Sequence, residues 1–273
     1  MRQLVLPRSY QGGPHLELEG KESQYLTKVL RLKRGQQILG RDTEGRKYLL
    51  TLIEITSHSC VLSCQQVEQS MQVQTTDALP SYQGPYPNLV LLQCLCKGRK
   101  EEQIFRQATE IGAATLALVS SRYCVTDLSD KKEKAVHARF ERLEIQIKEA
   151  LQQSGSPVPT QLVSQVLDLQ DVPSWWADRG LAIFFHQSTR SESQKTLTSL
   201  LEAHPIEKPV CVLIGPEGGF SDEECTFLEQ SGFYPVVLKT NILRSETAGV
   251  YALSAIQVLL TETYNNKPVH LSQ

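Results

Sequence analysis

The sequence predicts a two-domain chain in which a small β-barrel precedes an α/β domain with a mostly parallel sheet. Three observations lead to this prediction: a run of short strands in the first 67 residues, a stretch at 68–88 rich in Pro, Gln and Thr, and strands that alternate with helices from Leu89 onward. We place the first domain at 1–75, a linker at 76–88 and the second domain at 89–273. A chain of 273 residues has room for two domains of ordinary size.

The first domain is predicted to consist of short strands separated by turns. The strand segments are RQLVLP, HLELEG, QQILGRD, KYLLTLIEIT and VLSCQQV, with turn residues such as Gly12-Gly13-Pro14 between them. One helical stretch, SQYLTKVLRL, interrupts the strands. This pattern is typical of a small closed or partly closed β-barrel.

The second domain is predicted to alternate strands with helices. The strand segments are NLVLLQCLCK, ATLALVSS, LAIFFH, VCVLIG and PVVLK. Helices are expected in RKEEQIFRQATEIG, at 131–153, after Ser221 and from near Thr247. LAIFFH and VCVLIG are almost entirely apolar, as expected for strands that are covered on both faces of a parallel sheet.

Composition excludes some classes of protein. No apolar run approaches the roughly 18 residues that a membrane span needs, and the N-terminal residues show no apolar signal segment, so we expect a cytoplasmic protein that binds no membrane. The seven cysteines lack CxxC spacing and a nearby histidine cluster. We therefore expect reduced, mostly buried cysteines and no metal site.

The formal net charge of −2 hides an asymmetry along the chain. Residues 1–75 carry ten Lys or Arg and seven Asp or Glu, which leaves the rest of the chain acidic. The segment KVLRLKR places Lys28, Arg31, Lys33 and Arg34 close together without an acidic residue. Such a segment favours contact with a phosphate backbone, and an ordinary solvated basic face explains the charge equally well.

The segment LIGPEGGFSDEE, residues 213–224, follows an apolar strand and precedes a helix. Its three glycines permit backbone angles that other residues avoid, and Ser221 with Glu224 forms a predicted capping box. The segment has neither the Lys-Ser/Thr of a phosphate loop nor the glycine spacing of a dinucleotide site, and its acidic first turn would repel phosphate. It suits a ligand without phosphates, or a glycine-rich turn with no ligand.

The segment LKTNILRSETAGVYALSAIQVLL, residues 238–260, places a cation, a carboxylate and a hydroxyl after a strand: Arg244, Glu246 and Thr247. The carboxyl ends of strands are where α/β sheets usually bind ligands. The alternative is a capped helix start with no ligand. The helix that follows is apolar nearly all round, so we expect it to be covered by the core and by a partner subunit.

These two segments together resemble the signatures of the RsmE family of SPOUT-class RNA methyltransferases, which methylate N3 of a uridine in small-subunit ribosomal RNA. KGRKEEQIFRQATEIGA, SRYCV, EALQQSG and KVLR resemble further segments of that family, so the resemblance covers most of the chain. It implies a PUA-like RNA-binding barrel, a C-terminal sheet with a trefoil knot, S-adenosyl-L-methionine as cofactor and a homodimer. The chain departs from the family pattern at Gln107, Ser156 and 239–241, where potential RNA-contacting cations are missing.

The resemblance also implies roles for individual residues. The expected cofactor-binding residues are Leu213, Ile214, Gly215, Pro216, Glu217, Gly218, Gly219, Leu238, Lys239, Ile242, Leu243 and Arg244. Arg244, Glu246 and Thr247 are the expected catalytic residues. His186 follows the strand LAIFFH, and this position suits either a residue that faces the cofactor or a structural histidine. Charge and resemblance together predict that RNA is contacted by Lys28, Arg31, Lys97, Arg99 and Lys100.

The predicted function is therefore methylation of a small-subunit (16S) ribosomal RNA at N3 of a uridine. Two alternatives stay open at this point. One is a catalytically silent RNA-binding or ribosome-assembly factor with the same fold, and the other is the same chemistry at a different RNA site.

Overall fold

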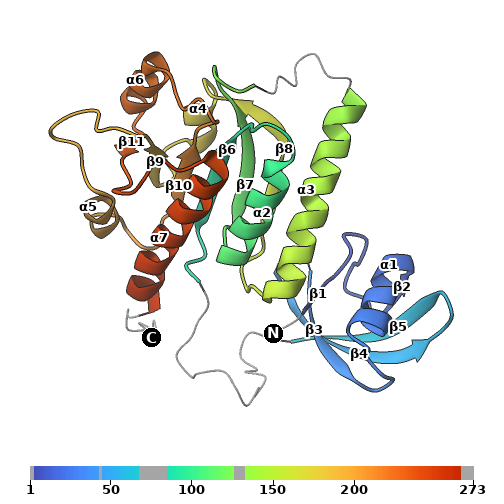
Figure 1. Ribbon diagram of the computed structural model, residues 1–273. Helices are drawn as coiled ribbons and strands as arrows, with labels where there is room; N and C mark the ends of the chain where they lie inside the picture. The colour runs from blue at the N-terminus through green and yellow to red at the C-terminus, as the bar shows by residue number, and fades with distance from the viewer. Residues whose placement is uncertain (1–2, 43–44, 68–84, 126–132, 266–273) are drawn as a thin grey trace. The chain divides into compact units, whose positions relative to one another are not determined.

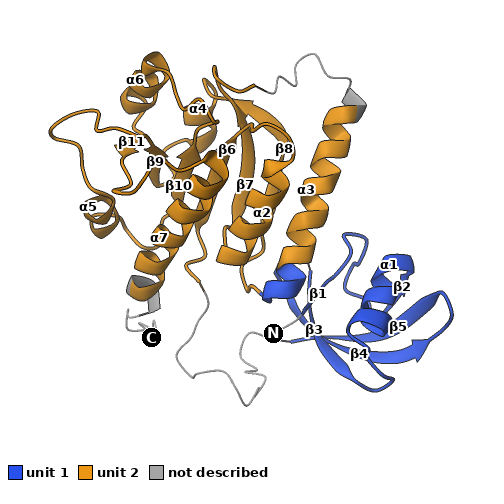
Figure 2. Cartoon of the chain, viewed as in Figure 1, with its two compact units in different colours: residues 1–80, 151–155 blue, residues 81–150, 156–273 orange. Residues whose placement is uncertain are grey.

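The computed structural model describes residues 3–42, 45–67, 85–125 and 133–265. The chain forms two compact units: unit 1 holds residues 1–80 and 151–155, and unit 2 holds 81–150 and 156–273 (Figure 2). The predicted linker at 76–88 falls mostly outside the described residues. The domain boundaries at 75 and 89 therefore remain a prediction.

Unit 1 is built on a five-stranded sheet with the order β1-β3-β4-β5-β2. Its strands are β1 (Gln3–Val5), β2 (His15–Glu19), β3 (Gln37–Arg41), β4 (Lys47–Ile55) and β5 (Ser59–Gln66). The predicted strands are all present, and every pairing is antiparallel except that of β1 with β3. Alternate residues of β4, namely Tyr48, Leu50 and Leu52, are buried in the core of this unit. In the described pairings β1 and β2 form the two edges.

The helical stretch of unit 1 differs from the prediction. Instead of one helix over 23–32, the chain forms α1 (Gly20–Gln24) followed by a π-helical segment, η1 (Tyr25–Val29). The Thr27 hydroxyl donates to the Ser23 carbonyl, a local bond that competes with the regular helix. Arg31 then adopts a left-handed φ of 54°, which ends the segment before Leu32.

Unit 2 contains a six-stranded sheet with the order β11-β9-β10-β6-β7-β8, in which every pairing is parallel (Figure 1). Its strands are β6 (Leu89–Cys94), β7 (Thr115–Ser120), β8 (Gln161–Asp168), β9 (Leu181–Phe185), β10 (Val210–Ile214) and β11 (Tyr234–Val236). The central strands β6 and β10 are buried along their whole length. Their sequences, apolar except for Gln93 of β6, follow from this position, because helices cover both faces.

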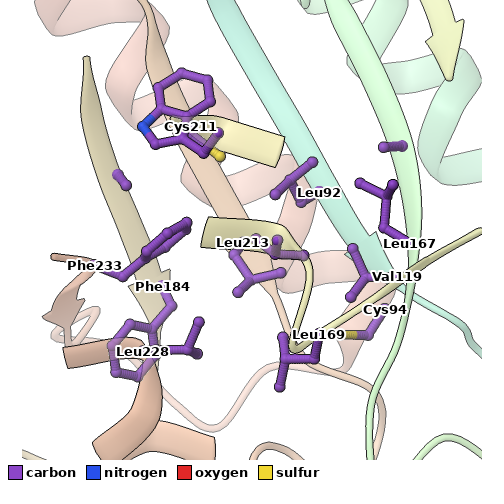
Figure 3. Close-up of a cluster of buried hydrophobic side chains, with 14 of the residues drawn as sticks. Leu92, Cys94, Val119, Leu167, Leu169, Phe184, Cys211, Leu213, Leu228 and Phe233 are labelled. Atoms are coloured by element: carbon purple, nitrogen blue, oxygen red, sulfur yellow. The ribbon is translucent and has the colours of Figure 1, made fainter. Parts of the chain in front are cut away.

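The helices of unit 2 pack on both faces of the sheet. They are α2 (Lys100–Ile111), α3 (Glu133–Ser154), α4 (Val172–Trp176), α5 (Leu197–Glu202), α6 (Asp222–Gln230) and α7 (Ser245–Asn265). Leu92 and Leu213 point into a cluster with residues of α4 and α6 (Figure 3). The alternate residue Gln93 points to the opposite face, where α2 and α7 lie side by side (Figure 1).

Three elements of unit 2 were not predicted: β8, α4 and α5. The strand β8 lies at the edge of the sheet, and Leu167 is its one fully buried residue, so its sequence lacks the apolar run that marks the central strands. The strand expected at 235–239 ends at Val236. The helix expected from near Thr247 begins earlier, at Ser245.

The predicted capping box at the start of α6 is confirmed. The Ser221 hydroxyl accepts from the Glu224 amide at 3.2 Å, and the Glu224 carboxylate accepts from the Ser221 amide at 2.8 Å. The second oxygen of Glu224 accepts from the Arg122 amide at 2.7 Å. One buried carboxylate therefore caps the helix and fixes the chain after β7.

Glu224→Ala should destabilise unit 2 by about 2 kcal/mol or more, because it leaves two amide donors without a partner. Glu223→Ala is the matched control, since the Glu223 side chain is 77% exposed and its ion pair is with the exposed Arg122. Both tryptophans of the chain, Trp175 and Trp176, lie in unit 2. Urea denaturation followed by tryptophan fluorescence therefore reports on this unit, and equal midpoints for the two variants would contradict the prediction.

Candidate functional site

A cleft of about 360 Å³ lies at the carboxyl ends of β9, β10 and β11. Three chain segments form its walls, namely 185–187 after β9, 214–220 after β10 and 238–248 after β11. These strands are neighbours in a parallel sheet, so the segments that follow them emerge at the same edge. The cleft is thus a direct product of the sheet order.

The glycines of the segment 215–219 have different roles. Gly219 adopts a φ of +70°, which favours glycine, whereas the prediction of unusual angles is wrong for Gly215 and Gly218. A Cβ at Gly218 would stand 2.9 Å from the Tyr123 Cβ, and one at Gly215 would stand 3.2 Å from the Phe220 ring. At these two positions glycine is needed for close packing, because a side chain would collide with Tyr123 or Phe220.

The segment 238–244 forms the opposite wall and exposes its side chains. Ile242 is 82% exposed although it is apolar, and it lines the cleft beside Leu238 and Leu243. Thr240 and Asn241 add polar groups to the same wall. A wall that combines exposed apolar side chains with a few polar groups suits a heterocyclic ligand.

A buried hydroxyl joins the two walls. Ser245 Oγ donates to the Gly215 carbonyl at 2.7 Å and accepts from Gln93 Nε2 at 2.9 Å. Burial raises the pKa of the Cys96 thiol to about 12, so the thiol stays protonated and donates to the same oxygen at 3.4 Å. A Cβ at Gly249 would approach Gln93 Oε1 to 3.2 Å, so a small residue there leaves space for the Gln93 amide.

A second link between the walls is ionic. The Lys100 ammonium lies 2.7 Å from Glu217 Oε1 and 3.1 Å from Glu246 Oε2. Hydrogen bonds to Glu217 and Glu246 raise the pKa of Lys100. Burial acts to raise the pKa of Glu217, but hydrogen bonds from Lys100 and from backbone amides outweigh it and hold this pKa below its usual value.

The predicted catalytic residues lie together at the start of α7. Arg244 lines the cleft, is exposed, and makes no ion pair within the part of the chain that the structure describes. Glu246 is largely buried at the Lys100 pair, and Thr247 is exposed one residue further along the helix. The Arg244 carbonyl accepts from the amides of Thr247 and Ala248, which fixes the backbone at this helix start.

Ten of the twelve expected cofactor-binding residues line the cleft. The other two are Leu213, which is fully buried in the core, and Lys239, which is not among the lining residues. His186 lines the cleft after β9, and its Nδ1 lies 2.9 Å from the Ser188 carbonyl oxygen. The role of each of these residues stays a prediction.

Several lining residues were not predicted from the sequence: Phe185, Gln187, Phe220, Thr240, Asn241, Ser245 and Ala248. Phe185 and Gln187 could have been found from the position of β9, which is the sheet neighbour of both β10 and β11. That order cannot be read from the sequence, because β9 precedes β10 in the chain but lies between β10 and β11 in the sheet.

The five residues expected to contact RNA fall into both units. Lys28 and Arg31 are exposed in unit 1, while Lys97 and Arg99 are exposed in the loop before α2. Lys100 differs from the others because its ammonium is held by Glu217 and Glu246. It is the one member of this set with two carboxylate partners among the described residues.

All seven cysteines are free, and five of them are buried, as predicted. Within the described ranges no group of three or more His, Cys, Asp or Glu side chains is placed to hold a metal ion. No helix in that part of the chain has the length and apolar character needed to cross a bilayer.

Comparison with known proteins identifies the family. The model of the RNA methyltransferase domain matches residues 83–257, which include every residue of the cleft. The chain belongs to the RNA methyltransferase family. The model of the RNA methyltransferase PUA domain matches residues 18–63, so this methyltransferase carries the predicted PUA-like domain in unit 1.

Curated relatives of this methyltransferase share about a quarter of its sequence over nearly the whole chain. Ribosomal RNA small subunit methyltransferase E of Bacillus subtilis is 26% identical over 89% of this chain and 90% of its own. Ribosomal RNA small subunit methyltransferase E 2 of Borreliella burgdorferi is 26% identical over 97% of this chain and all of its own. These matches confirm the predicted resemblance to the RsmE family.

Solved structures share the fold of this methyltransferase. The small subunit methyltransferase E of Neisseria gonorrhoeae, bound to S-adenosyl methionine, superposes with a TM-score of 0.76 at 21% identity, covering 95% of this chain and 98% of that one. A probable rRNA-methyltransferase of Porphyromonas gingivalis superposes with a TM-score of 0.74 at 22% identity, covering 97% of this chain and all of that one. Both domains of the predicted architecture are therefore shown, and the knot stays a prediction.

Ser245→Ala should destabilise unit 2 of the methyltransferase by about 1–3 kcal/mol, because it removes the bond to Gly215 and leaves the buried Gln93 amide without that acceptor. Ser254→Ala on the same helix is the matched control, since its hydroxyl has no hydrogen bond within the described structure. The denaturation midpoints of both variants are measured by tryptophan fluorescence. Equal values would show that the buried hydroxyl contributes nothing.

Proposed function

We propose that this protein transfers a methyl group from S-adenosyl-L-methionine to N3 of a uridine in small-subunit ribosomal RNA. The observation that carries the proposal is the cleft itself, which brings the segment 214–220 together with Arg244 at one edge of the sheet, while Glu246 and Thr247 follow in the first turn of α7 without lining the cleft. The names of the curated relatives support ribosomal RNA of the small subunit as the substrate. The uridine N3 target comes from the RsmE resemblance.

The residues present fit S-adenosyl-L-methionine. A volume of about 360 Å³ lies within the usual range for small-molecule sites. The backbone of 215–219 offers neutral donors and acceptors, and the acidic start of α6 disfavours a phosphate. Leu238, Ile242 and Leu243 would pack against the adenine. When bound, the cofactor supplies an activated methyl group on a sulfonium.

Methyl transfer to uridine N3 would form the N3–CH₃ bond at the expense of the N3–H bond and of the S–CH₃ bond of the sulfonium, which would become a thioether. Negative charge spreads onto the ring oxygens as the proton departs. We assign to Arg244 the stabilisation of this charge, because it lines the cleft and its guanidinium has no competing carboxylate in the described structure. Glu246, or a water that it positions, accepts the proton, and Thr247 orients the base.

RNA binding is assigned to exposed cations in both units. Lys28 and Arg31 in the PUA-like domain, with Lys97 and Arg99 near the cleft, would contact phosphates. We assign the protein to the cytoplasm, because small ribosomal subunits are found there in bacteria such as Bacillus subtilis, the source of one relative.

A homodimer is part of the proposal. The helix α7 exposes three large apolar side chains: Tyr251 at 48%, Val258 at 57% and Leu259 at 37%. An apolar surface on one helix suits a twofold contact with the same helix of a second copy. Size-exclusion chromatography with light scattering tests it, and a monomer at micromolar concentration would count against it.

The first test is a methylation assay with labelled S-adenosyl-L-methionine and small ribosomal subunits from a strain that lacks this gene. Nucleoside mass spectrometry should find one new 3-methyluridine in the RNA. A different methylated nucleoside would keep the enzyme class and overturn the target. Cofactor binding with no transfer to any RNA would favour a silent RNA-binding factor.

Arg244→Ala should lower kcat by about 10²-fold in this assay, because the developing negative charge loses its cation. Arg244→Lys should recover part of the loss, since a point charge replaces the planar guanidinium. Arg122→Ala is the matched control, because Arg122 is exposed and lies outside the cleft. Normal turnover by Arg244→Ala would refute the assignment.

A further inference from the structure

Lys100 holds two carboxylates that come from opposite walls of the cleft. Its ammonium lies 2.7 Å from Glu217 in the segment after β10 and 3.1 Å from Glu246 in the first turn of α7. The side chain is 31% exposed, as is that of Glu217, and Glu246 is 18% exposed. This half-buried cluster is a stronger link than a pair of fully exposed side chains.

The position of Lys100 in its own helix needs an explanation. Lys100 is the first residue of α2, where the helix dipole disfavours a cation. The next two residues, Glu101 and Glu102, are the acidic residues expected there, and they pair with Arg139 and Arg142 of α3. The ammonium is therefore stabilised by Glu217 and Glu246 rather than by α2.

We propose that Lys100 is a positioning residue for methyl transfer, which joins the cofactor segment to the catalytic start of α7. This inference rests on the proposed function. Without the ammonium, Glu217 and Glu246 would face each other as two like charges and separate. With it, the carboxylate of Glu246 is held in one place while Glu217 keeps the segment 214–220 against α7.

The same geometry separates Lys100 from the exposed cations of this region. The side chains of Lys97 and Arg99 are exposed to a phosphate, and the nearest carboxylate oxygen that pairs with Arg99 among the described residues is that of Glu102, at 3.9 Å. A cation that already has two carboxylate partners has little charge left to offer RNA. Lys100 should therefore affect the turnover step and not the capture of RNA.

Steady-state kinetics with small subunits tests this division. Lys100→Met should lower kcat by about tenfold or more while KM for the RNA changes by less than about twofold, and Lys100→Arg should restore at least part of kcat. Lys208→Met is the matched control, since Lys208 is exposed and lies outside the cleft. A raised KM with unchanged kcat would make Lys100 an RNA contact, and no change in either constant would also overturn the proposal.

The pH profile gives a readout that a merely structural role would not move. The groups facing Lys100 are Glu217, Glu246 and the protonated Cys96 thiol. Because the pKa of Glu217 is lowered and that of Lys100 is raised, the Lys100–Glu217 ion pair is lost only as the pH falls through the lowered pKa of Glu217 or rises through the raised pKa of Lys100. Lys100→Met removes the cation, so the acid limb of cofactor affinity should move to higher pH. An unchanged limb would contradict the link to Glu217.

A double-mutant cycle separates failure of this proposal from failure of the proposed function. The urea midpoints of Lys100→Met, Glu246→Gln and the double variant are measured without cofactor or RNA. The proposal requires the urea midpoint of the double variant to fall by less than the sum of the decreases in the two single variants. Additive losses of stability would overturn this proposal even if methylation is observed. A non-additive loss without any methylation would support the Lys100–Glu246 contact and overturn the proposed function.

Discussion

The hydroxyl of Ser245 is the contact on which the cleft depends. It is buried, and it connects the first residue of α7 to the Gly215 carbonyl and to Gln93 in the centre of the sheet. It joins the segment after β10 to the segment after β11 in the interior, whereas the Lys100 cluster links the same segments in a half-buried position. Because a buried polar group that loses its partner is costly, the Ser245 contact holds the spacing of the two walls.

Much of the fold could be predicted from local sequence patterns. The central strands were found because β10 is apolar throughout and β6 is apolar except for Gln93, and the start of α6 was found because Ser221 and Glu224 form a capping box. The edge strand β8 was missed because only Leu167 of its residues is buried, so its sequence has no apolar run. Strand order was also out of reach, since parallel pairing depends on tertiary packing rather than on local sequence.

The candidate site shows the same division. The glycine segment and Arg244, Glu246 and Thr247 were recognisable as residue types that suit chemistry after a strand. Lys100 was grouped with Lys97 and Arg99 because charge in a sequence says nothing of its partners. Only the folded chain brings Glu217 and Glu246 to the same ammonium. The different roles that we infer for the basic residues of this segment therefore follow from their partners in the folded structure and cannot be read from the sequence.

The parallel pairing of β6 with β10 also has a consequence for synthesis of the protein. Leu89 pairs with Val210, so one side of a strand that is buried on every residue stays unpaired until much of the chain has left the ribosome, while β7 can pair with its other side earlier. Contacts between such distant segments slow folding, and an unpaired apolar strand is prone to aggregation. Nascent chains that stop before β10 should therefore be clients of chaperones. Unit 1 depends less on late synthesis, because 151–155 is its one segment from beyond residue 80.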